Sequence, residues 1–541
     1  MKKIFFLLFI AHYSLLIANC FAQQPTEEWV RRYSDTSTTF RAAYSIKADS
    51  FGNIYVLAEK NNDFGFIKYD QNGNLLTVAS HWPGGYNNGK GEYFDVTSDG
   101  NVYITGYVNN NFNQWIYTVK YNTNGVLQWS KLYNYDNSDG SNDIKIDKDG
   151  NIVLVGGSSI GGNNYALIIK YSSSGDTLWT RHFNNGQSNA YFSKFMFDNS
   201  NNIYIAGNLS IPGVCLIMKY NSNGNQQWFT TFTNNPSRSY GGYGICLDGN
   251  SNLYVIGTES VPFSGWNDYL LKLNNSGTVI WGKVFTGILS GQGRTSIPAI
   301  GPVVSLDGNS IYFSTMVSNG MGGGSYSIAT IKYDSNGDSQ WVKVYGGGIP
   351  GANRVSNIKL DKQDNVYICG TGYYLTSGDD FVVIKYASTG TQQWVTTYTG
   401  LVTNGSDNAT DLYIDTNYNV YVTGNSASSN NPGVAVTIKY SQLIGISINY
   451  NELPNQYKLY QNYPNPFNGS TVINYEIPKK SNVELKIYDM LGRLIKTLVK
   501  SEQNASYYSI NLETGNLASG IYFYKISAGD ITDTKKMILI K

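Results

Sequence analysis

Charge and histidine are scarce in this chain of 541 residues. Asp, Glu, Lys and Arg make up 14% of the residues, against about 25% in an average soluble protein, and the net charge is +1. This near balance excludes a nucleic-acid binder that relies on a basic surface, and it leaves no acidic tail. Beyond the N-terminal segment, the histidines are His81 and His182. Two histidines offer little basis for a His-based catalytic triad or a multi-histidine metal site.

Cysteines and long apolar runs are also few. Cys215, Cys246 and Cys369 lie in apolar, strand-like patterns, which favours buried thiols over a disulfide framework. At the N-terminus, "MKK", an apolar stretch and "CFA" before Gln23 predict a signal peptide over residues 1–22. A lipidated Cys20 is the alternative. No later stretch has 18 uninterrupted apolar residues, so we expect no membrane span.

What is abundant is glycine and tyrosine, with 57 and 45 residues, and they occur in a repeat. "GNIYVLAE" (52–59) recurs as "GNVYITGY", "GNIVLVGG", "NNIYIAGN", "SNLYVIGT", "NSIYFSTM", "DNVYICGT" and "YNVYVTGN". Each copy follows an alternating segment that ends in or near Asp, and precedes a second strand of the type "FIKYD". Seven of these strands are followed by Gly, and six by Trp four residues after that Gly; the first connector has Thr77 instead. Eight copies of about 50 residues indicate a repeat architecture.

Each copy predicts strands A (ending at Asp), B ("GNIYV"), C ("IKY") and D (starting at Trp). Four-stranded antiparallel meanders repeated eight times are typical of an eight-bladed β-propeller. The last copy stops after its C strand at Tyr440, whereas Trp29 begins a D strand that no C strand precedes. We therefore expect the N-terminal strand to complete the eighth blade and close the ring, which removes the exposed edges.

The repeated residues have structural interpretations. Gly in the C–D turns supplies the positive φ that such turns need, and Trp is expected to fill the wedge between blades. A lysine ends every C strand, and a ring of lysines is one interpretation. We favour lysines that pair with the Asp of strand A or extend along the surface, for example Lys170 with Asp147.

After residue 440 the pattern changes. A linker over 441–456 leads to "YKLYQNYPNPFNGSTVINYEIPKK", "LKIYDMLGR", "LASGIYFYKI" and a terminal "KKMILIK". Their alternation and Gly-rich turns predict a small immunoglobulin-like β-sandwich over 457–541. This segment resembles the C-terminal sorting domain of type IX secretion (type A). The resemblance implies export across the outer membrane of a Gram-negative bacterium, with the secretion machinery and its sortase as partners. The propeller is expected over residues 23–440, of which residues 29–440 resemble the SBBP-type bacterial propeller repeats; that family implies a fold and little chemistry.

The sequence gives no sign of a cofactor or a metal centre. "DKDGN" (147–151) and "DSNGD" (334–338) faintly resemble calcium loops, but Gly stands at the fourth position and no Glu follows at the twelfth. Eight-bladed quinoproteins carry adjacent cysteines beside their cofactor, and this chain has none. We expect no cofactor, no metal and no catalytic residues, although a polysaccharide lyase or hydrolase that uses Asp, Glu, Tyr or Arg stays open.

The eight copies differ in their B–C and D–A loops, which share one face of the ring. Binding residues are often found on such loops. Aromatic side chains there could stack on sugars or anchor a protein, and three arginines from successive D–A loops could attract carboxylates or sulfates. The candidate ligand-binding residues are Trp82, Trp115, Arg238, Trp266, Arg294, Arg354, Tyr373 and Tyr374.

Three functions compete. We expect a monomeric, secreted or surface-attached propeller that recognises a glycan, matrix or cell-surface protein. The alternatives are a glycan-degrading enzyme and a purely structural surface protein. A deep polar funnel would favour the enzyme, an aromatic shelf would favour binding, and a flat, filled face would favour a scaffold.

Overall fold

The computed structural model describes residues 24–33, 42–59, 62–135, 138–186, 189–261, 265–286, 299–318, 326–346, 353–402, 404–428, 431–442, 456–462, 465, 467, 470–513, 515, 517–529 and 531–540. The predicted signal peptide, Cys20 and Arg294 lie outside these residues. The chain splits into two compact units after Gln442.

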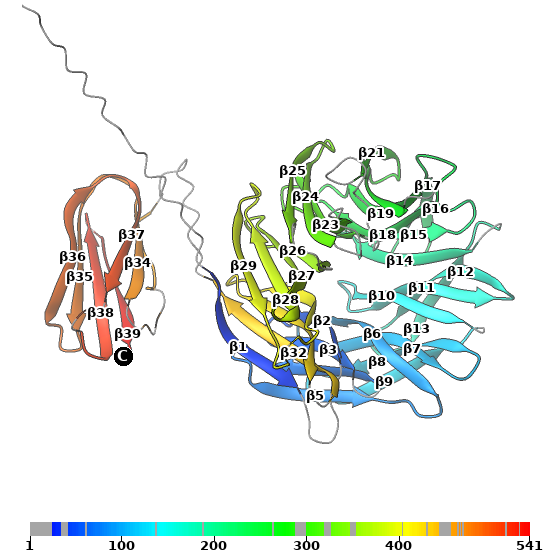
Figure 1. The fold of residues 1–541 in the computed structure, drawn as a ribbon, viewed down its shortest axis with the longest axis horizontal. Helices are drawn as coiled ribbons and strands as arrows, with labels where there is room; N and C mark the ends of the chain where they lie inside the picture. Colours follow the sequence, from blue (N-terminus) through cyan, green and yellow to red (C-terminus); the bar gives the residue numbers. More distant parts are fainter. Residues whose placement is uncertain are drawn as a thin grey trace, which may run out of the picture. The chain divides into compact units, whose positions relative to one another are not determined.

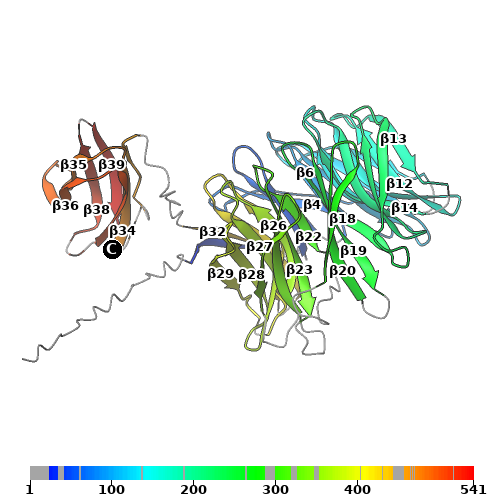
Figure 2. The same ribbon diagram turned by 90° about the horizontal axis from the view of Figure 1, so that it is seen from above.

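The first unit is the predicted eight-bladed propeller. Its strands form eight four-stranded antiparallel sheets, each with neighbouring strands in chain order except at the closure, and the sheets are arranged as blades around a common axis (Figure 1). The first strands of adjacent blades contact one another and so lie nearest the axis. Figure 2 shows the same ring turned by 90°. The all-β fold class predicted from the repeat is confirmed.

The strands of blades 1 to 4 are β2 (Ala42–Ala48), β3 (Ile54–Glu59), β4 (Phe64–Tyr69) and β5 (Leu75–His81); β6 (Asn88–Val96), β7 (Val102–Asn109), β8 (Gln114–Tyr121) and β9 (Leu127–Tyr133); β10 (Asp139–Ile146), β11 (Ile152–Ile160), β12 (Asn163–Tyr171) and β13 (Thr177–Phe183); β14 (Ala190–Phe197), β15 (Ile203–Leu209), β16 (Val214–Tyr220) and β17 (Gln226–Phe232). Those of blades 5 to 8 are β18 (Tyr240–Leu247), β19 (Leu253–Val261), β20 (Gly265–Leu273) and β21 (Val279–Phe285); β22 (Ile300–Val304), β23 (Ser310–Ser318), β24 (Tyr326–Asp334) and β25 (Ser339–Tyr345); β26 (Arg354–Leu360), β27 (Val366–Tyr374), β28 (Gly378–Tyr386) and β29 (Gln392–Tyr398); β30 (Asn408–Ile414), β31 (Val420–Ser428), β32 (Asn431–Ser441) and β1 (Thr26–Tyr33).

Blade 8 is closed by the N-terminal strand, as the sequence predicts. β1 pairs antiparallel with β32, and Trp29 lies opposite Lys439. Blade 8 therefore has no C–D turn, and Gln442 takes over the contacts that this turn makes elsewhere. Its side-chain oxygen accepts hydrogen bonds from Trp394 Nε1 at 3.0 Å and from Lys385 Nζ at 2.9 Å. The backbone pairing of β1 with β32 thus closes blade 8, and the buried amide of Gln442 joins blade 8 to blade 7.

The repeated Trp and Gly hold neighbouring blades together. The ring of Trp228 in blade 4 lies against Gly277 in the C–D turn of blade 5, so a Cβ at Gly277 would come within 2.7 Å of it. Gly277 also has φ +83°, where an L side chain is strained. Trp228 Nε1 donates to the carbonyl of Asn275 in the same turn at 3.0 Å. The same arrangement recurs at other junctions, and it confirms that Trp fills the wedge between blades.

The repeated lysines bind the same turns. Lys272 Nζ donates to Ser335 O of blade 6 at 2.9 Å, and Trp281 Nε1 donates to that carbonyl at 3.1 Å. The lysine and the tryptophan of one blade therefore donate hydrogen bonds to the same backbone carbonyl of the next blade. Most of these lysines also lie over the Tyr ring of their own B strand, as Lys272 does over Tyr254. This is a structural role, but the repeated partner is a backbone carbonyl rather than the Asp of strand A.

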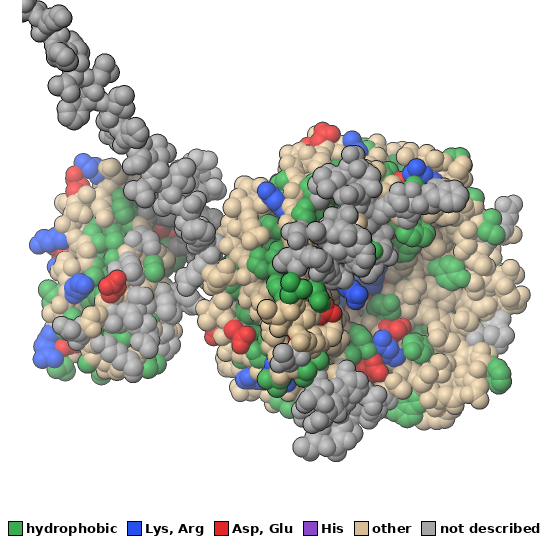
Figure 3. Space-filling model, viewed as in Figure 1, with side chains coloured by type: hydrophobic (Ala, Val, Ile, Leu, Met, Phe, Trp, Pro, Cys, Tyr) green, Lys and Arg blue, Asp and Glu red, His purple; other side chains and the backbone are tan. Residues whose placement is uncertain are grey.

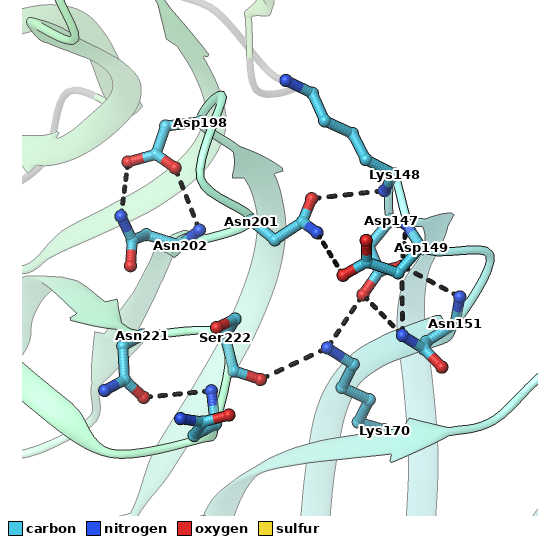
Figure 4. Close-up of polar contacts among 11 residues, drawn as sticks. Asp147, Lys148, Asp149, Asn151, Lys170, Asp198, Asn201, Asn202, Asn221 and Ser222 are labelled. Atoms are coloured by element: carbon cyan, nitrogen blue, oxygen red, sulfur yellow. Dashed lines mark hydrogen bonds and ion pairs between the residues drawn. The ribbon is translucent and has the colours of Figure 1, made fainter.

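Blade 3 is the exception that forms the expected ion pair, at 2.8 Å between Lys170 and Asp147 (Figure 4). Its B strand has Val153 where other blades have Tyr. In blade 5, for instance, the Tyr254 hydroxyl donates to Asp248 and occupies that carboxylate. Without this hydroxyl, the Asp147 carboxylate is left to the lysine.

The second unit is a sandwich of two antiparallel sheets. One contains β33 (Lys458–Leu459), β34 (Ser470–Ile477) and β37 (Ser506–Glu513); the other contains β36 (Leu494–Gln503), β35 (Ser481–Asp489), β38 (Gly520–Ala528) and β39 (Ile531–Leu539). Phe467 is buried in the core, and its N–H donates to Ile538 O. The Tyr524 hydroxyl donates to Tyr460 O and accepts from Asn462 N–H. The described residues Tyr460, Asn462 and Phe467 of "YQNYPNPFN" therefore contact β38 and β39.

Candidate functional site

The ring has two unlike faces. The A–B and C–D turns lie on one face, which we call the turn face; the B–C and D–A loops lie on the opposite loop face. In six of the A–B turns an Asp accepts hydrogen bonds from N–H groups two and four residues later, as Asp147 does from Asp149 and Asn151; Thr97 and Ser305 take this position in blades 2 and 6. "DSNGD" folds the same way around Asp334. Both resemblances to calcium loops thus lie in hydrogen-bonded turns.

The first strands bring charged side chains together at the axis. Each first strand carries a β-bulge. In seven blades, the residue three positions after the bulged residue pairs with the same position of strand B, the one that Tyr55 holds in blade 1. Around the ring this level holds Lys47, Asp95, Lys145, Met196, Cys246, Val303 (blade 6, from its pairing with Tyr312), Lys359 and Tyr413. One step nearer the loop face, Asp143, Lys194 and Asp411 belong to the next level. We call these seven lysines and aspartates the axial cluster.

Ion pairs and backbone donors connect the members of the axial cluster between blades. Lys47 Nζ lies 2.7 Å from Asp95, whose other oxygen accepts from Ile146 N–H of blade 3. Lys145 and Lys194 approach the same carboxylate, that of Asp143, at 3.3 and 3.5 Å. These positively charged neighbours keep the pKa of Asp143 below its ordinary value, against the opposing effect of burial.

Asp411 is occupied by neutral donors. It accepts from the Ser45 hydroxyl and Ile46 N–H of blade 1, and from Asn357 of blade 7 at 2.5 Å. Lys359 lies beside it, on blade 7, and makes no hydrogen bond or ion pair to any residue that the structure describes. Burial among protein atoms lowers the pKa of Lys359, and so do the charges of Lys47 and Lys145, while Asp411 raises it.

A second charged group lies on the loop-face side of blades 1 and 2. The Tyr44 hydroxyl donates to Glu59, and Lys90 Nζ lies 4.2 Å from the centre of the Tyr44 ring. Burial raises the pKa of Glu92, and Glu59 raises it further, although Lys90 acts in the opposite direction. Figure 3 shows basic and acidic side chains gathered around the hollow at the middle of the ring, over β6 and β10.

Aromatic side chains gather further out on the loop face, in the D–A and B–C loops of blades 1 to 3. Tyr86 and Trp115 pack edge to face at 6.0 Å, and the Trp82 ring lies over Gly89. Trp82 is 38% exposed, Phe112 91% and Tyr135 61%. We call these five residues the aromatic shelf.

Amides surround the aromatic shelf. Asn87 donates to Asn111, and Gln114 donates to Asp139 O of the next blade at 3.3 Å. The two histidines lie below: His81 contacts the Tyr117 hydroxyl at 3.1 Å and His182 contacts the Tyr133 hydroxyl at 2.6 Å. Burial lowers the pKa of both histidines, which favours their neutral form. They support the surface rings and are not placed to act together.

The other candidate residues are dispersed. Arg238 is paired at 2.5 Å with Glu259, whose side chain is 1% exposed, so this arginine is already neutralised. Arg354 is exposed two blades away, at the start of β26. Trp266 is 41% exposed on blade 5.

Tyr373 and Tyr374 lie at the loop-face end of blade 7. The Tyr374 hydroxyl contacts that of Tyr345 at 2.5 Å, and Tyr373 N–H donates to Asn353. Trp82 and Trp115 thus lie on the loops of blades 1 and 2, and the rest of the described candidates lie on blades 5 and 7.

A cavity of about 550 Å³ opens on the turn face between blades 2 and 3, lined by the A–B turns 95–99 and 146–150. Asp95 of the axial cluster also lines this cavity. Asp147 binds Lys170 and Asn151, and Asp149 accepts from Asn201 of blade 4 (Figure 4). Among the described residues, no group of three or more His, Cys, Asp or Glu side chains is arranged to hold a metal.

The axial cluster was missed by the sequence analysis. Its signal is a single column of the repeat, two residues before the residue that ends strand A (Asp in most copies, Thr97 in blade 2). Lys47, Asp95, Lys145 and Lys359 occupy this column, where other copies have mostly apolar residues. The bulge conceals it, because it breaks the period-2 alternation that identifies which side chains face the same way.

Residues 461–541 match the family described as "Secretion system C-terminal sorting domain". This match confirms the sorting domain expected from "YQNYPNPFN" and the terminal strand. The protein is therefore a substrate of type IX secretion, which interacts with that machinery, and is secreted or displayed on the surface of a Gram-negative bacterium. Within the described residues, no helix has the length and apolar character that crossing a bilayer requires.

No curated protein matches the chain. Solved structures resemble it weakly. PorZ, a surface component of the type IX secretion system of Porphyromonas gingivalis, is 11% identical with a TM-score of 0.30, over 92% of this chain and 81% of that one. The polysaccharide lyase Uly1 is 11% identical with a TM-score of 0.43, over 77% and 99%. A PL25 ulvan lyase is 11% identical with a TM-score of 0.41, over 75% and 95%. Such likenesses assign no activity.

Proposed function

We propose that the protein is a monomeric recognition module, of the SBBP-repeat type, that binds a glycan through the aromatic shelf outside the cell. The observation that carries this proposal is the gathering of exposed Trp82, Phe112 and Tyr135 beside Asn and Gln amides on one face. Aromatic rings stack on the apolar faces of sugars, and amides bond to hydroxyls. A soluble protein rarely exposes such rings together without a partner for them.

The rigid base under the shelf supports this proposal. Trp115 and Tyr86 pack on the core shared by blades 1 and 2, and Gln114 bridges to the next blade. A surface held in this way loses little conformational entropy when a ligand binds. The identity of the sugars that bind will distinguish a cell-wall glycan from a matrix or host glycan.

The test is a glycan array probed with the purified protein, followed by calorimetry on each glycan that binds. We expect Trp82→Ala and Trp115→Ala to weaken binding more than about tenfold, because such aromatic anchors often contribute more than about 2 kcal/mol. Phe51→Ala is the matched control, since Phe51 is 69% exposed but lies on the turn face. Equal losses for all three variants, or no saturable binding, would overturn the proposal.

A second candidate, a glycan-degrading enzyme, is favoured by one observation. Glu59 and Glu92 lie in one charged group with Tyr44 and Lys90 on the loop-face side of blades 1 and 2, and the raised pKa of Glu92 suits a general acid. Product analysis of every bound glycan distinguishes the two functions. Shortened or unsaturated products that disappear in Glu92→Gln would establish the enzyme; intact glycans would leave the recognition module.

A further inference from the structure

We propose that the axial cluster is a binding site for an oxyanion, a sulfate or carboxylate group, held between Lys359, Lys145 and Lys47. The site is separate from the aromatic shelf and does not depend on a glycan binding there. It lies inside the ring, at the level of the first strands nearest the turn face.

The geometry brings the three lysines together from different blades. Lys359 and Lys145 belong to blades 7 and 3, which are four positions apart and therefore opposite in a ring of eight. Both occupy the same register on their first strands, opposite Tyr367 and Val153. The positive charges of Lys145 and Lys47 nevertheless lower the pKa of Lys359. The shared register places the three side chains at one level around the axis, where Lys47 contacts Asp95 and Lys145 contacts Asp143.

Charge in this space is not balanced. The axial cluster has four lysines and three aspartates, a formal excess of one positive charge. The oxygens of Asp411 accept hydrogen bonds from the neutral donors Ser45, Ile46 N–H and Asn357. Asp143 is shared by Lys145 and Lys194, and Asp95 neutralises Lys47. Lys359 retains no carboxylate partner among the described residues. Since like charges in a confined space repel one another, an anion placed between them is attracted.

Three blades contribute only uncharged side chains at this level of the ring. Blades 4, 5 and 6 contribute Met196, Cys246 and Val303 at this level. They supply neither a competing carboxylate nor a hydrogen-bond acceptor strong enough for an ammonium group. Lys359 is exposed to solvent while surrounded by protein atoms, as expected for a side chain inside a water-filled opening.

Calorimetric titration of the purified protein at pH 7 with sodium sulfate, at constant ionic strength, tests the proposal. Titration with a galacturonic acid trisaccharide distinguishes a free inorganic anion from a carboxylate on a sugar. We expect saturable binding of at least one probe, weakened about 10- to 100-fold in Lys359→Met, the range for loss of a charge-assisted hydrogen bond. Lys359→Arg should retain binding. Lys362→Gln is the control, because Lys362 is exposed in the A–B turn of the same blade.

The unliganded proteins give a second readout. Because Lys359 carries an unpaired charge that burial penalises, Lys359→Met should raise the melting temperature in low salt without sulfate and abolish the further rise that the anion produces in the parent protein. A lower melting temperature for Lys359→Met, or unchanged affinity for both probes, would overturn the proposal. Absence of saturable binding to either probe would overturn it as well.

Discussion

The outer strands of the blades repeat the same contact residues, whereas the first strands vary from blade to blade. At the turn face, Trp, Lys and Gly recur and make the same contacts, and even the odd junction at blade 8 restores them through Gln442. On the first strands, one register position holds Lys, Asp, Met, Cys, Val or Tyr. Contacts that position neighbouring blades must be repeated for the ring to close, whereas the axis is free to vary. The difference separates the scaffold from the part available for function.

The largest expected effect comes from breaking a scaffold contact. Trp394 is 2% exposed and bonds to Gln442 at the closure, so Trp394→Ala should destabilise the propeller by about 3–5 kcal/mol in urea unfolding. Trp266→Ala is the matched control, because Trp266 lies outside the repeat and is 41% exposed; its cost should stay near about 0.5 kcal/mol. Similar costs for both variants would contradict a special role of the repeated Trp.

Gln442→Ala should have the next largest effect. The buried amide accepts from Lys385 and Trp394 and donates to Tyr367 and Tyr418, and its loss leaves two donors without partners. We expect a loss of about 2–3 kcal/mol, and faster hydrogen exchange of the β32 amides than of the β12 amides. Gln442→Glu keeps the acceptor and should cost less. Uniform exchange across the ring would show that Gln442 does not control the closure.

These contacts mark how far the sequence could predict the molecule. The missing C strand before Trp29 and the missing D strand after Tyr440 were enough to predict ring closure. The role of Gln442 was not predictable, because it replaces a backbone carbonyl with a side chain that belongs to no repeat. The partner of Lys170 was predicted correctly, since Val153 leaves Asp147 available, but the carbonyl partners of the other lysines come from the next blade and leave no pattern in the sequence.

Val153→Tyr would convert blade 3 to the common pattern. The new hydroxyl should bond Asp147 and displace Lys170, which would keep its other bond, to Ser222 O at 3.2 Å. Because one contact replaces another, the free energy of unfolding should change by less than about 1 kcal/mol. A crystal structure of this variant that keeps the Lys170–Asp147 pair, with the introduced tyrosine turned away, would show that the tyrosine does not decide the partner of the lysine.

The smallest effect is expected at the hollow and has the opposite sign. Burial and Glu59 raise the pKa of Glu92 above its ordinary 4.5, with Lys90 opposing them. The folded state therefore holds this proton more tightly. Its contribution to stability is present below about pH 4.5 and is lost as the pH rises through the folded-state pKa.

Glu92→Gln removes the carboxyl group whose ionisation costs stability as the pH rises. The variant should therefore be more stable than the parent protein between about pH 4.5 and 8, by less than about 1 kcal/mol because the side chain is only half-buried. Glu484→Gln is the control, since the pKa of Glu484 is lowered by Lys486 and Lys500 and its removal should act in the reverse direction. Parallel pH profiles for Glu92→Gln and the parent protein would mean that the hollow imposes no strain on this carboxyl. A gain in stability for Glu92→Gln, against losses for Trp394→Ala and Gln442→Ala, is the pattern expected where a ring keeps a destabilising charge for binding or chemistry.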